Sequence, residues 1–292
     1  MAQRLNKVIE LLAAGKVVFG GAFASTGNMD DPLAYADLRY DFVIFEMEHE
    51  GFDLPGLRLS LQFLLDRKRI AKTGSLQPDI VPMVRIPPNA RENNQWIVKQ
   101  ALDAGVYGIV LPHLDSVDQA KAAVVAARYP QATGVADRLP IGERGLWQRI
   151  APRYWGLSPA EYYDRADIWP LDPEGELFLM PIVEGIKGIE NLGDILREVK
   201  GISAIWAGSA DLSAELGARG DIHHASVEDG LQKILATCKA FDVPCAVYAS
   251  AADVEKRVEQ GFRIIISSPS RVDPALKLGR AAAQSRPGFR PP

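Results

Sequence analysis

The sequence predicts an α/β protein of the (β/α)₈ or TIM-barrel class, folded as a single domain over residues 1–292. Apolar runs rich in β-forming residues alternate with segments of helical period along almost the whole chain, which is typical of right-handed crossovers in a parallel sheet. There are eight such runs, and eight strand–helix units close into a barrel. The length of 292 residues also suits one barrel, which takes about 250 residues.

Each expected strand is a short apolar run between segments of helical period. In order, the runs are Val17–Phe23, Phe42–Met47, Ile80–Ile86, Gly108–Pro112, Leu177–Val183, Ala204–Ala207, Cys245–Ala249 and Phe262–Ser267. A doubly wound open sheet is the structural alternative. It usually carries a glycine-rich phosphate loop after its first strand, but the residues after Gly20 and Gly21 fit neither G-x-G-x-x-G nor a P-loop.

Helical periodicity fills the segments between these runs. The expected helices are Leu54–Leu65, Gln95–Ala104, Val117–Ala127, Ile186–Val199, Val227–Phe241 and Ala252–Gln260. A further helix is expected at the N-terminus, where one face carries Leu5, Val8, Ile9 and Leu12. Charged residues interrupt this segment, which does not fit a signal peptide, and no run of 18 apolar residues predicts a membrane span.

One region breaks the alternation between the fourth helix and the fifth strand. This insertion, approximately residues 131–174, contains three of the five tryptophans, Trp147, Trp155 and Trp169. A loop of this length is usually functional or an interface element, so we expect a lid or a subunit contact. Its aromatic content suggests a bulky or aromatic partner molecule. The C-terminal tail, residues 285–292 (SRPGFRPP), is expected to be a loose arm or a strap on a neighbour.

The composition gives no attraction to polyanions. The formal net charge is −4 and the pI is near 5.7, so no nucleic-acid or membrane partner is expected. The densest basic run, Arg67–Lys72, fits a solvated helix end. Cys238 and Cys245 do not form C-x-x-C and fit small buried apolar positions, which favours a reducing, cytoplasmic setting.

Titratable side chains follow five consecutive expected strands, at the ends where barrel enzymes carry their chemistry. These residues are Glu46 with His49, then Arg85, His113, Glu184 and Asp211. Glu184 and Asp211 follow adjacent parallel strands, so their carboxylates can converge. Such a pair predicts an all-oxygen site for Mg²⁺ or Mn²⁺, with Co²⁺ as a further candidate. The alternative for Asp211 is an N-cap of the helix that follows it.

The remaining residues at this end predict substrate binding and proton transfer. Arg85 suits a bound carboxylate or enolate oxygen, and its alternative is a structural ion pair with Glu46 or Glu184. His49, three residues after Glu46, predicts an acid-oriented general base, although a loop histidine without catalytic role is the alternative. His113 is expected to line the pocket or to cap a helix. Two further histidines, His223 and His224, fit surface positions.

These residues stand in stretches that resemble the class II pyruvate aldolases of the HpcH/HpaI aldolase–citrate lyase superfamily, from about Gly15 to Gly279. The stretches are 42–53 (FVIFEMEHEGFD), 85–130 with its D-A-G and V-L-P-H motifs, and 182–217 with G-S-A-D-L-S. The resemblance implies that Glu184 and Asp211 bind the metal and that Arg85 holds the 2-oxo oxygen. It also implies that His49 and Glu46 form the acid–base dyad, and that backbone amides around Gly208, Ser209 and Ala210 bind the substrate carboxylate.

The sequence departs from the family pattern in three places. The dyad acid is Glu46 where Asp is usual, Ser209 stands where the family has Pro, and the insertion is longer than in the simplest members. The last departure resembles a macrophomate-synthase-like branch that decarboxylates oxaloacetate. The resemblance further implies a homo-oligomer, either a hexamer or a trimer of dimers, with an eighth helix exchanged between subunits.

We therefore expect a metal-dependent carbon–carbon lyase that cleaves a 4-hydroxy-2-oxo acid to pyruvate and an aldehyde through a metal-bound pyruvate enolate. An oxaloacetate decarboxylase or macrophomate-synthase-like enzyme would use the same residues. A Schiff-base aldolase would need a lysine inside a strand, and none of the eight runs has one. A CoA-thioester lyase would need a basic patch that the sequence lacks. A catalytically silent barrel that acts in binding or assembly is the alternative of another class.

Overall fold

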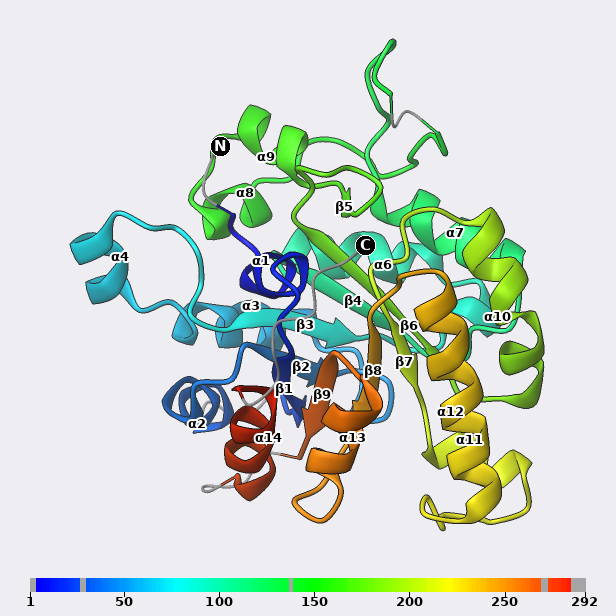
Figure 1. Ribbon diagram of the computed structural model, residues 1–292. Helices are drawn as coiled ribbons and strands as arrows, with labels where there is room; N and C mark the ends of the chain where they lie inside the picture. Colours follow the sequence, from blue (N-terminus) through cyan, green and yellow to red (C-terminus); the bar gives the residue numbers. More distant parts are fainter. Residues whose placement is uncertain (1–3, 27–29, 137–138, 269–272, 285–292) are drawn as a thin grey trace.

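The structure, a computed structural model that describes residues 4–26, 30–136, 139–268 and 273–284, is a closed parallel barrel surrounded by helices (Figure 1). The neighbouring strands run β1–β2–β3–β4–β6–β7–β8–β9, and β9 pairs with β1 to close the ring. Their bounds are β1 Val18–Ala24, β2 Phe42–Glu46, β3 Val81–Arg85, β4 Gly108–Leu111, β6 Leu177–Val183, β7 Ile205–Ala207, β8 Cys245–Tyr248 and β9 Ile264–Ser267. All eight strands predicted from the sequence are confirmed.

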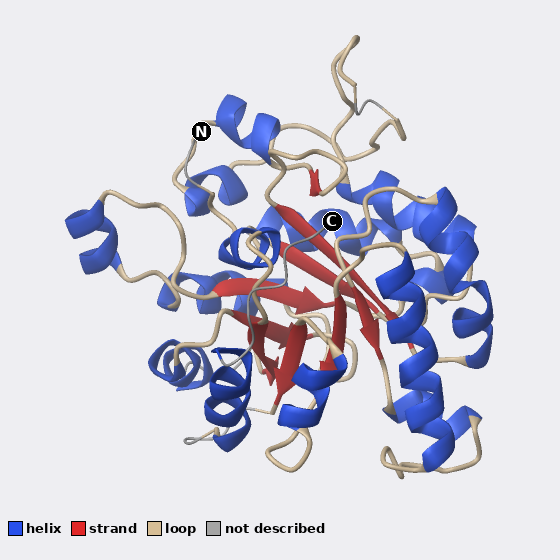
Figure 2. Ribbon diagram, viewed as in Figure 1, coloured by secondary structure: helices blue, strands red, loops and turns tan. Residues whose placement is uncertain are grey.

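Helices cover the outside of the barrel (Figure 2). Seven expected helices are present: α1 Lys7–Ala13, α3 Leu54–Phe63, α6 Gln95–Ala104, α7 Val117–Ala127, α10 Ile186–Glu198, α12 Ala225–Ala240 and α13 Val254–Gln260. The basic run forms a separate helix, α4 Arg67–Thr73, which has no buried residue, so it is solvated but does not end the preceding helix. The sequence analysis did not assign α2 Asp30–Leu38, α5 Asn89–Glu92, α8 Ile150–Trp155, α9 Pro159–Arg165 and α14 Pro274–Gln284.

The strands read as continuous apolar runs because both of their faces are covered. Every residue of β2 and of β6 is buried. Inside the barrel, Phe42 lies so close to β1 that a Cβ added at Gly20 would lie 2.0 Å from its ring. The ring of Phe42 therefore takes the place of a side chain at Gly20. No helix of the described residues is both long enough and apolar enough to cross a membrane.

The aromatic insertion lies at the N-terminal end of the strands. It connects the end of α7 to the start of β6, and it adds a two-residue strand, β5 Ile168–Trp169, beside Leu177 and Phe178. In Figure 1 its helices α8 and α9 lie at the opposite end of the barrel from α11 Ala210–Glu215. The insertion therefore does not form a lid over the C-terminal end of its own barrel, and that expectation is wrong. The other expectation, that the insertion contacts a second subunit, stays a prediction.

Buried polar and aromatic contacts hold this insertion in place. Arg128 is fully buried and donates hydrogen bonds from Nε and Nη2 to the carboxylate of Asp167, at 2.7 and 2.6 Å. Trp155 stacks on Tyr107, with ring centroids 4.1 Å apart, and its indole N–H donates to the carbonyl of Gly105 at 2.8 Å. The aromatic residues that suggested a bulky aldehyde are thus largely structural.

Candidate active site

The predicted site residues meet at the C-terminal end of the barrel, because their strands run in parallel and end at the same rim. The β2–β3 register places Glu46 directly beside Arg85. His113 follows β4, Glu184 follows β6, and Asp211 lies in the first turn of α11 after β7. The structure therefore brings the charged strand ends into one cluster.

Glu46 is buried and holds Arg85. Its carboxylate accepts a hydrogen bond from Arg85 Nε at 2.7 Å and lies 2.5 Å from Nη2. The other carboxylate oxygen accepts hydrogen bonds from the backbone N–H groups of Glu48, at 2.6 Å, and His49, at 3.1 Å. The ion pair considered as the alternative for Arg85 is thus present in the structure.

Glu48 is the functional candidate that the sequence analysis missed. Its carboxylate lies 3.1 Å from Arg85 Nη1, 3.5 Å from His49 Nε2 and 3.8 Å from His113 Nε2. Burial is the main cause that raises the pKa of this carboxyl group, and the charge of Arg85 opposes the rise. The sequence carried only a weak signal, because Glu48 lies beyond Glu46, the last residue of β2, where strand alternation no longer fixes the direction of a side chain.

His49 lies at the outer edge of this cluster. Its side chain is 70% exposed, and its ring contacts Glu48, whereas Glu46 reaches only its backbone N–H. The structure therefore brings His49 and a carboxylate together, but the contacting carboxylate is Glu48. A ring open to solvent and beside an acid can exchange protons with a bound molecule.

Three side chains form a candidate metal site: His113, Glu184 and Asp211 each offer one ligand atom, and these atoms lie within 4.8 Å of one another. His113 is therefore a further candidate ligand beside the two carboxylates, and the all-oxygen site stays a prediction. His113 has φ of 58°, and its backbone N–H donates to Glu184 at 2.8 Å while Nδ1 lies 3.4 Å from the same oxygen. Burial lowers the pKa of His113, which favours the neutral ring that metal binding requires.

The donor set fits a divalent cation. Burial, opposed by the hydrogen bond from the His113 N–H and assisted by the nearby carboxylates of Asp211 and Glu48, raises the pKa of Glu184 to about 8. Three acidic groups that repel one another around a partly buried position are stabilised by a cation between them. Asp211 makes no side-chain cap for α11, whose N-cap is Ser209, so the capping alternative is not observed.

Two further features shape the cluster. A Cβ at Gly208 would lie 2.6 Å from Cβ of Glu184, so a larger residue there would displace this carboxylate. Gly208 is buried, Ser209 is half-buried and Ala210 is exposed, all beside Asp211. On the other side, the ring centroid of Phe23 lies 4.6 Å from Arg85 Cζ, and this ring stacks at 6.5 Å on Trp206. Phe23 itself has φ of 70° at a bulge in β1.

The chain is similar to known proteins over most of its length. The family model described as HpcH/HpaI aldolase/citrate lyase matches residues 34–268. The chain is 27% identical over 246 residues to a hydroxypyruvate/pyruvate aldolase of Paraburkholderia phytofirmans, with 84% of each chain covered. It is 32% identical over 233 residues to a 2-keto-3-deoxy-L-rhamnonate aldolase of Klebsiella pneumoniae, covering 78% of this chain and 75% of that one.

A solved structure shares the whole architecture. The crystal structure of an HpcH/HpaI aldolase/citrate lyase family protein from Burkholderia cenocepacia superimposes with a TM-score of 0.74 and 27% identity. The match covers 96% of this chain and 98% of that one. The likeness thus extends over the barrel and the elements around it.

Proposed function

This chain belongs to the HpcH/HpaI aldolase/citrate lyase family, and on that premise we propose that it is a class II aldolase that cleaves a 4-hydroxy-2-oxo acid to pyruvate and an aldehyde. The observation that carries the proposal is the convergence of His113, Glu184 and Asp211 within 4.8 Å, on the rim that also holds Arg85. Aldolases among its relatives, with keto acids in their names, support the same reaction class.

Glu184 and Asp211 would hold the divalent cation, with His113 as a third ligand or as a hydrogen-bond partner of Glu184. When bound, the cation would supply positive charge where the enolate oxygen develops. With His113 as a ligand, the site would suit Co²⁺ or Mn²⁺ better than Mg²⁺; with His113 as a hydrogen-bond partner only, the two carboxylates would suit Mg²⁺ or Mn²⁺. Mn²⁺ suits both arrangements and is the metal that we propose, with Co²⁺ as the second candidate.

The chain's own side chains account for the remaining steps. Arg85 binds the 2-oxo oxygen and stabilises the negative charge that builds up there as the C3–C4 bond breaks. Glu46 fixes the guanidinium through two contacts, so Arg85 needs little reorganisation during the reaction. The amides near Ser209 and Ala210 bind the substrate carboxylate, as the family resemblance implies.

Proton transfer falls to His49 and Glu48. In the cleavage direction His49 takes the proton of the 4-hydroxyl group, the C3–C4 bond breaks as the aldehyde carbonyl forms, and the ring then returns that proton to C3, which gives pyruvate. Glu48, 3.5 Å from the ring, orients it. The role that the sequence analysis gave to Glu46 is divided in this proposal, because Glu46 positions Arg85 and Glu48 serves His49.

The quaternary structure is proposed to be a homo-oligomer. The insertion exposes Leu139, Leu146 and Trp147 at 70%, 56% and 90%, and such side chains are commonly covered by a second copy. The cytoplasmic setting expected from the cysteines stays a prediction.

The test is pyruvate release from 4-hydroxy-2-oxo acids and from oxaloacetate, with Mn²⁺, Co²⁺ or Mg²⁺ and again with EDTA. The proposal expects release from at least one hydroxy acid that EDTA abolishes and metal restores. Release from oxaloacetate alone would establish the decarboxylase alternative instead. A folded, metal-loaded protein that releases pyruvate from none of them would support the silent barrel.

A further inference from the structure

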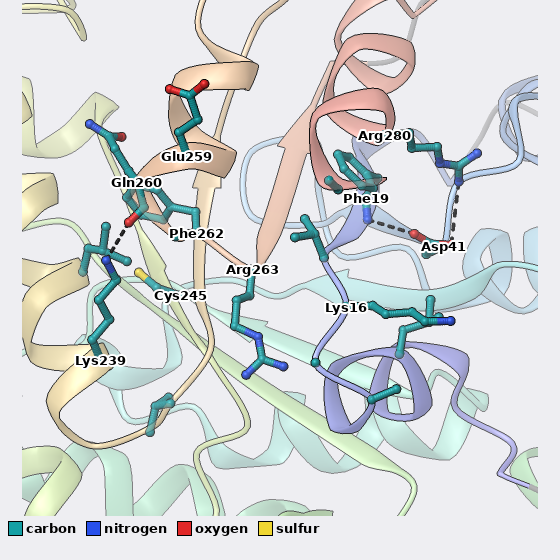
Figure 3. Close-up of a pocket in the computed structure, with 18 of the residues that line it drawn as sticks. Lys16, Phe19, Asp41, Lys239, Cys245, Glu259, Gln260, Phe262, Arg263 and Arg280 are labelled. Carbon is teal, nitrogen blue, oxygen red and sulfur yellow. Dashed lines mark hydrogen bonds and ion pairs between the residues drawn. The ribbon is translucent and has the colours of Figure 1, made fainter. Parts of the chain in front are cut away.

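A cavity with a volume of about 1150 Å³ lies at the N-terminal end of the barrel, opposite the candidate active site. It is bounded by the end of α1, the first residues of β1 and β8, the residues before β9, and the last turn of α14 (Figure 3). Pockets for small molecules usually measure about 300–1000 Å³, so this cavity has room for one. No step of the proposed reaction uses it, and the inference below does not depend on the proposed function.

The walls of this cavity are mainly apolar. The apolar lining residues include Leu11, Val17, Phe19, Val243 and Phe262. Phe19 and Phe262 are buried, and the other three are half-buried. A hydrocarbon group that enters the cavity removes its own surface and that of the walls from water, which is favourable. The cavity therefore suits a ligand with an apolar body.

The lining also carries an excess of positive charge. Four basic side chains, Lys16, Lys239, Arg263 and Arg280, line the cavity beside three acidic ones, Asp41, Asp242 and Glu259. The carboxylate of Asp41 lies 3.0 Å from Lys7 Nζ, outside the lining, and 3.7 Å from Arg280 Nη2, so this acid is already neutralised. The remaining excess of basic side chains suits a ligand with a single negative charge.

Two of these basic side chains are fixed by backbone carbonyl groups at helix ends. Lys239 Nζ donates to the carbonyl of Gln260 at 2.6 Å, and Arg263 Nη2 donates to the carbonyl of Leu12. An ammonium group has three N–H donors and a guanidinium group has five, so each can hold a carbonyl and an anion together. The contacts therefore place the two cations without excluding a bound anion.

Arg263 occupies the centre of the charged part of the cavity. Figure 3 shows it between Lys239 on one side and Lys16 on the other. Burial lowers the pKa of Arg263, and the charge of Asp242 opposes this effect, so a bound anion would further stabilise the charged guanidinium. A planar guanidinium matches a carboxylate through two parallel hydrogen bonds. A carboxylate is thus the anionic group that fits this position.

We propose that this cavity binds an amphipathic monocarboxylate of the fatty-acid class, with its hydrocarbon chain against Leu11, Val17 and Phe262 and its carboxylate on Arg263. The bound molecule covers the apolar walls and connects α1 and α14 to the N-terminal ends of β1 and β8. The C-terminal arm expected from the sequence, residues 285–292, lies outside the described residues, and the proposed site is built without it.

The first experiment compares ligands on the unmodified full chain. Decanoate, octanoate and decanol compete with a fluorescent fatty acid for EDTA-treated protein, below the concentrations at which they form micelles. We expect decanoate to bind at least tenfold more tightly than decanol, because the carboxylate contacts Arg263. Octanoate, shorter by two methylene groups, should bind about 15-fold more weakly than decanoate. Pyruvate should not displace the fluorescent probe, because it binds at the other end of the barrel.

The second experiment places the ligand in the cavity by mutation. Ala14 is exposed and lines the cavity, so Ala14→Trp should fill part of it and weaken decanoate binding at least tenfold. Ala13→Trp is the matched control, because Ala13 is equally exposed but is not among the described lining residues. Arg263→Gln should weaken decanoate binding at least tenfold and decanol binding less than twofold. A purely structural role of Arg263 would weaken both ligands alike.

Three results would overturn the proposal. The first is equal affinity for decanoate and decanol, which would exclude a carboxylate site. The second is decanoate binding that Ala14→Trp leaves unchanged or that pyruvate abolishes, which would place the ligand outside this cavity. The third is binding that becomes tighter as the protein is diluted, which would show that a second copy of the chain occupies the cavity.

Discussion

Glu184→Gln should stabilise the metal-free protein while it abolishes metal binding. In the folded chain, burial and the neighbouring carboxylates raise the pKa of Glu184 to about 8, against an ordinary value of 4.5. Glutamine has nearly the same shape, and its side-chain oxygen can still accept the hydrogen bond from the backbone N–H of His113. The substitution therefore removes a titrating charge and keeps the packing.

The size of the effect follows from proton linkage. Between pH 4.5 and 8 the folded chain keeps a proton on Glu184 that the unfolded chain releases, so stability falls as the pH rises through this window. From pH 6 to pH 8 the loss of unfolding free energy is about 2 kcal/mol for this one group. At pH 7 the variant should be more stable than the parent by about 3 kcal/mol.

The assay is urea unfolding of EDTA-treated protein at pH 6, 7 and 8. The parent should lose stability with rising pH, and Glu184→Gln should lose markedly less. Glu190→Gln, an exposed glutamate of α10, is the matched control and should follow the parent. With saturating Mn²⁺, the parent's pH dependence should disappear, because Glu184 then carries no proton in the folded chain and has also lost its proton in the unfolded chain. A variant with the parent's pH dependence would refute the reasoning.

Three further predictions concern other parts of the molecule. Phe23→Ala removes the ring over Arg85, an interaction worth about 0.5–2 kcal/mol. In steady-state assays it should lower kcat/KM by about 2- to 30-fold, for hydroxy acids and for oxaloacetate alike. The control variant Phe63→Ala, at an exposed position of α3, should keep the kcat/KM of the parent. Asp167→Asn leaves Arg128 buried without its carboxylate and should lower the free energy of unfolding by about 3–5 kcal/mol. The kcat per folded molecule should stay unchanged. A loss below about 1 kcal/mol would contradict the structural role of this ion pair. Trp147→Ser should weaken self-association in light scattering, and an unchanged mass at every concentration would exclude Trp147 from the subunit contact.

The barrel could be predicted from the sequence because each strand is an apolar run that both faces bury, and this pattern survives in the order of the residues. The same logic predicted that Glu184 and Asp211 converge, since the ends of adjacent parallel strands meet at one rim. The place of Glu48 could not be predicted in this way, because it lies in the bend after β2, where the two-residue period of a strand has ended.

Other features depend on information that the sequence pattern does not carry. His113 joins the metal candidates because its backbone has φ of 58° and its N–H bonds to Glu184, and neither follows from a strand ending in Pro-His. The side of the barrel on which the insertion lies does follow from connectivity, because a segment that leads from a helix into a strand lies at the strand's N-terminal end. The aromatic residues of the insertion had suggested a role in substrate binding, but in the structure most of them pack against the barrel at its N-terminal end.

The most direct test of the proposed chemistry needs no second substrate. An enzyme that stabilises the enolate of pyruvate should exchange the methyl protons of pyruvate for deuterium in D₂O, which proton NMR follows over time. We predict exchange that requires Mn²⁺ or Co²⁺ and is lost in Glu184→Gln. A folded protein that binds the metal and pyruvate but leaves the methyl signal unchanged would contradict the account.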